Sequence, residues 1–82
     1  MERYLARLLD ERGSTKDFYR FDCLKAETVE KHIRKMMRKD NTGLITLIRK
    51  NWIERGVVEC EIYSSANGAY VAVRRFSMDW TV

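Results

Sequence analysis

The sequence predicts a small α+β domain in which a helix, a strand and two further helices precede a β-hairpin. Three observations favour this class. Apolar residues recur at helical spacing in three stretches, strict alternation marks the last third of the chain, and Asn67-Gly68 offers a hairpin turn between two alternating runs. The chain has 82 residues, no proline and no internal repeat, so residues 1–82 are expected to form a single domain.

The N-terminal quarter predicts a helix followed by a strand. The apolar residues of segment 1–12 have the i, i+3, i+4 spacing of an amphipathic helix, and they are Met1, Tyr4, Leu5, Leu8 and Leu9. Gly13 supplies a left-handed stop for this helix. Residues 16–23 are expected to form a short strand, because Tyr19, Phe21 and Cys23 alternate with Phe18, Arg20 and Asp22.

The middle of the chain predicts two helices. In segment 25–38 one narrow arc of a helix holds the apolar residues Ala26, Val29, Ile33, Met36 and Met37. Residues 40–43 break this helix and offer Asn41 or Thr42 as the next N-cap. Segment 43–54 fits either period, since a helix gathers its apolar residues in an arc of about 160° while a strand leaves them on both faces. A helix ending before Gly56 is favoured, and a strand stays open.

The last third predicts a hairpin and an alternating tail. Val58, Cys60 and Ile62 alternate with polar residues, residues 64–68 form the turn, and residues 69–76 return. Beyond the hairpin the apolar alternation continues through Phe76, Met78, Trp80 and Val82. Segment 76–82 is therefore expected to dock, either on the first helix of its own chain or against a second copy or a partner protein.

The segment Trp52-Ile53-Glu54-Arg55-Gly56-Val57-Val58 and the strands around Asn67-Gly68 resemble the end of the recognition helix and the wing of bacterial winged-helix repressors. This resemblance implies that the third helix enters the major groove of DNA while the hairpin touches the backbone. Segment 44–48 departs from the pattern, because four of its five residues are apolar where recognition helices are usually polar. We therefore expect phosphate contacts to dominate over base reading.

Positive charge is concentrated in the helical middle of the chain. The net charge is +4, and residues 25–55 hold nine of the sixteen Lys and Arg against four of the twelve Asp and Glu. Five cations share the face of the second helix opposite its apolar arc, namely Lys31, Arg34, Lys35, Arg38 and Lys39. This face is either a phosphate-binding surface, with Arg49 and Lys50 nearest the bases, or a solvated surface stabilised by Glu27–Lys31 and Glu30–Arg34 pairs.

The sequence offers little for catalysis or cofactors. It contains one histidine, His32, and no glycine-rich phosphate loop, nucleophile elbow or HExxH motif, so we expect a non-enzyme without cofactor. Four carboxylates could meet in space to form a nuclease site, namely Asp17, Asp22, Glu59 and Glu61. Their spacing in the sequence does not predict such a site. Cys23 and Cys60 are expected to be packed thiols, because two cysteines and one histidine leave a zinc site short of ligands.

These observations predict a small, cytoplasmic, non-catalytic module that binds nucleic acid, with duplex DNA as the expected partner and a repressor or accessory factor as the expected role. A homodimer is one arrangement that the apolar tail would support. No segment approaches the ~20 apolar residues of a membrane span. The alternative is a compact protein-binding module, such as a phage-type inhibitor of a host enzyme, with Trp52 and Trp80 as aromatic anchors.

Overall fold

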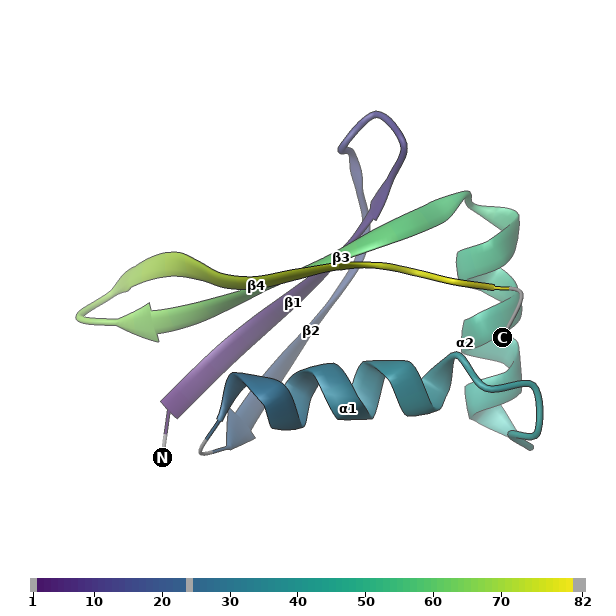
Figure 1. The fold of residues 1–82 in the computed structure, drawn as a ribbon, viewed down its shortest axis with the longest axis horizontal. Helices are drawn as coiled ribbons and strands as arrows, with labels where there is room; N and C mark the ends of the chain where they lie inside the picture. The colour runs from purple at the N-terminus through teal and green to yellow at the C-terminus, as the bar shows by residue number, and fades with distance from the viewer. Residues whose placement is uncertain (1, 24, 81–82) are drawn as a thin grey trace.

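Four antiparallel strands form one twisted sheet in the computed structural model, which describes residues 2–23 and 25–80 (Figure 1). The strands and helices follow the chain order β1 (Glu2–Asp10), β2 (Thr15–Cys23), α1 (Ala26–Met36), α2 (Leu44–Glu54), β3 (Val57–Ala66) and β4 (Ala69–Ser77). The strands lie side by side in the order β2-β1-β3-β4. β1 and β3 are therefore the inner strands, although residues 11–56 separate them in the sequence.

The winged-helix prediction is wrong, because the chain begins with a strand and not with a helix. Residues 1–12 were expected to be helical, yet Glu2–Asp10 pairs with β2 on one side and β3 on the other. The pairing explains the difference: Tyr4, Ala6 and Leu8 have the alternating burial of a strand, and a central strand has both edges hydrogen-bonded. The β-β-α-α-β-β order leaves no helix-first layout and no third helix among the described residues.

The turn between β1 and β2 uses the glycine that was expected to end a helix. Gly13 has a φ of 81°, the left-handed conformation that glycine adopts easily, but it lies in a hairpin loop. A carboxylate oxygen of Asp10 accepts hydrogen bonds from the backbone N–H groups of Arg12 and Ser14 at 3.0 and 2.8 Å. These bonds, chiefly that from Ser14, lower the pKa of Asp10 despite some loss of solvation.

The local predictions for the other elements are confirmed. α1 and α2 lie within the segments expected to be helical, and the strands of the predicted C-terminal hairpin are β3 and β4. Gly56 ends α2 with a φ of 75°, and the turn residues Asn67 and Gly68 have φ values of 51° and 79°. Positive φ at both central residues matches the right-handed twist of the flanking strands.

The core lies between α1 and one face of the sheet. Ala6 and Leu8 of β1 and Cys60 and Ile62 of β3 are fully buried there, and they pack with Val29, Ile33 and Met36 of α1. Burial raises the pKa of the Cys60 thiol to about 12, so the thiol stays protonated. Both cysteines are free thiols. Cys60 is buried, and the half-buried Cys23 packs against the core, as the alternation predicted for both.

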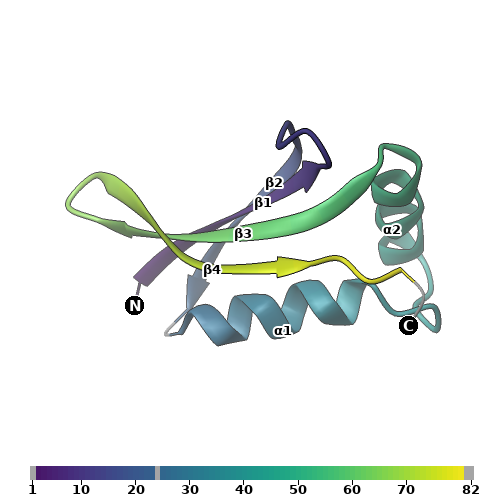
Figure 2. The ribbon, with the colours of Figure 1, turned by 45° about the horizontal axis from the view of Figure 1, so that its top comes forward.

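α2 stands at one end of the sheet, across the direction of α1 (Figure 2). Its one buried residue is Trp52, which donates an indole hydrogen bond to Asp17 at 2.9 Å and meets the ring of Tyr19 edge-on. The segment after β4 closes over the same corner: Met78 is buried, and the indole of Trp80 donates to the carbonyl of Val57 at 2.7 Å. The other face of the sheet carries no helix in the described structure.

Candidate functional site

The basic face of α1 is formed by five exposed side chains, and we use this name for Lys31, Arg34, Lys35, Arg38 and Lys39. The first four lie on α1 and its C-terminal turn, on the side away from Val29 and Ile33. Helical periodicity dictates this separation, because residues three and four apart share a face. Local spacing therefore placed Lys31, Arg34 and Lys35 on this face correctly, whereas Arg38 and Lys39, which it also assigned to the helix, follow the end of α1 at Met36.

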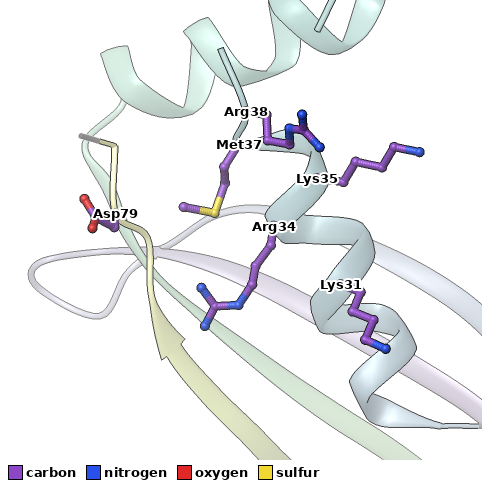
Figure 3. Close-up of a pocket in the computed structure, with 6 residues that line it drawn as sticks. All are labelled: Lys31, Arg34, Lys35, Met37, Arg38 and Asp79. Carbon is purple, nitrogen blue, oxygen red and sulfur yellow. The ribbon is translucent and has the colours of Figure 1, made fainter. Parts of the chain in front are cut away.

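A pocket of ≈ 460 Å³ opens between the basic face of α1 and the segment that follows β4. Its lining consists of Lys31, Arg34, Lys35, Met37, Arg38 and Asp79. Figure 3 shows Arg34 and Met37 reaching from α1 toward the segment that carries Asp79, whereas Lys31 and Lys35 extend away from it. Four cations and one carboxylate thus surround a single depression, whose electrostatic potential favours an anion.

The two arginines of this pocket are held by neighbours. Arg34 donates to Glu30 at 2.8 Å, and its guanidinium lies 4.5 Å from the ring centre of Phe76. Arg38 makes two hydrogen bonds, at 3.1 and 2.7 Å, to the carboxylate of Asp40. Their orientation is therefore set, and part of each charge is offset within the protein.

Glu30 links the basic face to the sheet. It accepts hydrogen bonds from Arg34 and from Arg74 of β4, the latter at 2.9 Å. These two guanidinium groups lower the pKa of Glu30, so it is ionised near neutral pH. Glu27 lies 4.0 Å from Arg74, so the Glu27–Lys31 pair expected from the sequence is not formed, while the Glu30–Arg34 pair is.

The three lysines of the basic face are the available cations. Within residues 2–23 and 25–80 the structure shows no ion pair or hydrogen bond for the amines of Lys31, Lys35 or Lys39, and all three side chains are exposed. Lysine presents a compact charge on a flexible stem, which suits contact with phosphate oxygens at variable positions.

Arg49 and Lys50, which the sequence placed nearest the bases of DNA, occupy different surroundings. Arg49 donates to the carbonyl of Met37 at 2.7 Å and lies 5.7 Å from the ring centre of Trp80, so it joins α2 to α1 and the tail. Lys50 is exposed, 4.0 Å from Glu54. The structure does not bring these two side chains into the pocket.

Asn41 positions the end of α1. Its side-chain amide donates to the carbonyls of Lys35 and Arg38, both at 2.8 Å, and so satisfies carbonyl groups that the helix leaves open. The sequence suggested Asn41 or Thr42 as the N-cap of α2, but that position belongs to Gly43. Asn41 thus fixes the C-terminal turn from which Arg38 extends.

The tail residues expected to form a docking segment pack on their own chain. Met78 is buried, Trp80 packs on Trp52, and Phe76 is half-buried beneath Arg34. Val82 lies outside the described residues. Because the first helix does not exist, the surface that receives the tail is formed by α2 and β3.

Sequence reasoning missed two sets of exposed apolar side chains. On α2, Leu44 and Leu47 are 71% and 63% exposed. On the outer strands of the sheet, Phe18 and Tyr70 are 55% and 51% exposed. The alternation in β2 places Phe18 on the opposite face from Tyr19 and Phe21. The sequence does not show that this face of the sheet is left uncovered, so it did not predict that Phe18 is exposed.

Other kinds of site find no support in the described part of the chain. No three His, Cys, Asp or Glu side chains there are grouped as metal ligands, and no helix there has the length and apolarity to cross a membrane. Asp17 and the half-buried Tyr19 are joined by a hydrogen bond of 2.9 Å, and Asp17 also accepts the Trp52 indole. Asp17 is thus engaged in the core, apart from Glu59 and Glu61, which pair with Arg75.

Comparisons of the chain with protein-family models, with curated proteins and with solved structures give no match.

Proposed function

We propose that this protein binds nucleic acid without catalysis, by contacts from the basic face of α1 to the phosphate backbone. The observation that supports the proposal is the pocket lined by four cations, Lys31, Arg34, Lys35 and Arg38, and by one carboxylate. A cytoplasmic location, which the two free thiols favour, is part of the same proposal.

The mode of binding depends on which of these cations are held by carboxylates of the protein and which are not. The lysines can each displace a counterion from a nucleic-acid backbone, and this release makes binding steeply dependent on salt. Arg34 and Arg38 keep their forks oriented by Glu30 and Asp40, so they add directed donors around the pocket. Because none of these groups presents a rigid array to base edges, the proposed contacts carry little sequence preference.

A titration of a short fluorescein-labelled DNA duplex in rising salt tests the proposal. We expect binding at about 50 mM salt, and the double variant Lys31→Glu with Lys35→Glu should reduce the affinity at least about tenfold. The slope of log affinity against log salt should become shallower by about 2, since two phosphate contacts are lost.

The matched control is Arg3→Glu with Arg12→Glu, which changes the net charge equally at exposed positions away from α1. This control should keep most of the duplex affinity. Absence of duplex binding at low salt, or equal losses in both double variants, would contradict the proposed phosphate surface.

A second candidate function, a protein-binding module such as an inhibitor of an enzyme, is favoured by α2. The chain already uses its tail internally, but Leu44 and Leu47 lie more than half exposed on one side of α2. Single exposed apolar residues are common, whereas neighbouring large ones on a helix are typical of interfaces. A protein partner retained by the wild type should be lost on Leu44→Lys with Leu47→Lys and kept on Val71→Lys, another apolar site that is more than half exposed, on β4.

A further inference from the structure

The open face of the sheet, opposite α1, carries its own ordered set of side chains. Paired residues share a face, so the register places Arg7 next to Phe18, Leu5 next to Arg20, and Ser65 next to Tyr70. A pocket of ≈ 290 Å³ lies on this face and is lined by Leu5, Arg7, Thr15, Phe18, Arg20 and Tyr70. Side chains from both outer strands therefore meet in one depression.

Phe18 and Tyr70 differ from every other aromatic residue in the chain. Of the nine aromatic residues, six are in ring or cation contacts and Tyr4 is buried in the core. Phe18 and Tyr70 show no such contact within the described residues, and more than half of each side chain is exposed. Two exposed rings that line one depression are typical of a binding surface, whereas singly scattered ones are common on any protein.

The arginines around the two rings have different roles. Arg7 lines the depression in a fixed position, because its guanidinium donates to Thr15 at 2.8 Å and to the hydroxyl of Tyr63 at 3.0 Å. Arg20 lies on β2 two residues after Phe18, on the same face, and the structure shows no partner for it among the described residues. A free guanidinium beside an exposed ring can reach the phosphate of a nucleotide whose base stacks on that ring.

We propose that the open face of the sheet binds single-stranded nucleic acid, with bases stacked on Phe18 and Tyr70 and a phosphate held by Arg20. Stacking requires an accessible base face, which a duplex does not offer. The remaining arginines of this face are largely neutralised, since Arg3 pairs with Asp22 at 3.6 Å and Arg75 pairs with Glu59. The face thus combines apolar rings with limited net charge, which favours stacking over the charge-driven binding proposed for α1.

This second site goes beyond the phosphate surface of α1 and is independent of it. The two lie on opposite sides of the sheet, so a nucleic acid that contacts both must pass around an outer strand. Their tests use different probes and different residues, and either can fail without the other.

The experiment measures fluorescence anisotropy of labelled oligo-dT and oligo-U strands against the full chain at low salt. We expect each of Phe18→Ala and Tyr70→Ala to weaken single-strand binding about tenfold, because each removes one stacked base. Phe18→Trp should restore or strengthen it. Arg20→Glu should weaken it further and reduce its salt dependence.

The matched control is Val71→Ala, since Val71 is adjacent to Tyr70, 57% exposed and on the opposite face of β4. It should leave oligonucleotide affinity unchanged. Lys31→Glu with Lys35→Glu should leave the effects of Phe18→Ala and Tyr70→Ala intact, which separates this site from the α1 surface.

Three results would overturn the inference: no binding of either oligonucleotide by the wild type, equal affinity in wild type and both alanine variants, or equal weakening by Val71→Ala. Loss of a protein partner on Phe18→Ala with single-strand affinity unchanged would also overturn it, because the open face would then be a protein interface. Circular dichroism checks that each variant keeps the fold.

Discussion

The two helices are equal in length, eleven residues each, but they are attached to the sheet in different ways. α1 buries Val29, Ile33 and Met36 along its whole length and presents charge to solvent. α2 buries Trp52 alone and leaves Leu44 and Leu47 exposed. A helix can thus be attached by a continuous apolar stripe or by one large anchor, and the second mode leaves apolar surface uncovered.

The difference has a consequence for where binding surfaces arise. The apolar stripe of α1 is buried in the core. The exposed face of α1 is therefore polar and suits an ionic ligand. In α2 the anchor is a single indole, hydrogen-bonded to Asp17 and packed on Tyr19 and Trp80. Ile48 and Arg49 add contacts to the core and to Trp80, while Leu44 and Leu47 on the exposed side of α2 are left for another role.

The largest expected effect is the loss of the α2 anchor. Trp52→Ala should lower the free energy of unfolding by about 3–5 kcal/mol, because it removes the one buried side chain of α2 and leaves a large cavity. Urea unfolding followed by circular dichroism measures this. Ile53→Ala, at the next and partly exposed position, should cost less than about 1 kcal/mol; equal costs would mean that α2 is not held by one anchor.

A smaller effect is expected where α1 is joined to β4 by charge. Glu30 has a lowered pKa, so its contribution to stability is present above its unfolded pKa of about 4.3 and is lost as pH falls through the lower folded value. Glu30→Gln should therefore reduce stability at neutral pH by less than about 1 kcal/mol and flatten the loss on acidification.

Thermal unfolding between about pH 7 and 2 measures the effect of Glu30→Gln, with Glu27→Gln as the control. Glu27 makes the longer contact, 4.0 Å, to the same Arg74. If both variants had the same pH profile as the wild type, the ion-pair link between α1 and β4 would contribute nothing.

The smallest effect is expected on the exposed side of α2. Leu47→Lys should change the free energy of unfolding by no more than about 0.5 kcal/mol, because the side chain is already mostly in water. Equilibrium urea titration of the purified chain is sufficient. A loss of several kcal/mol would show that Leu47 is a packing residue and would remove the basis of the protein-binding candidate.

The sequence predicted α1 well and α2 less well, and the same contrast explains why. Val29, Ile33 and Met36 form a continuous stripe that only a helix produces, and the face opposite them could be named residue by residue. In segment 43–54 the exposed Leu44 and Leu47 add apolar residues outside the side that carries Trp52. The apolar pattern therefore fitted both a helix and a strand. The ambiguity between helix and strand came from apolar side chains that are not buried in the core.

For residues 2–10 the sequence predicted a helix, whereas the fold has a strand. Glu, Arg, Leu and Ala are good helix formers, and Leu5 and Leu9 complete a helical spacing with Leu8. In the fold Tyr4, Ala6 and Leu8 face α1, Leu5 faces the open side, and Leu9 is buried after a shift of register beyond Leu8. Hydrogen bonding to β2, the next strand along the chain, and to the distant β3 outweighed the local preference.

The sequence by itself determined the parts whose stabilising contacts are local: the amphipathic α1 with its basic face, the Gly56 stop, and the β3–β4 hairpin around Asn67-Gly68. Only the tertiary structure decided that β1 is a central strand, that the tail packs on α2, and that one sheet face is open with Phe18 and Tyr70 at its rim. Helical spacing and turns are set by neighbours within a few residues. Strand pairing and the covering of a sheet face depend on segments far apart in the chain, which no local pattern records.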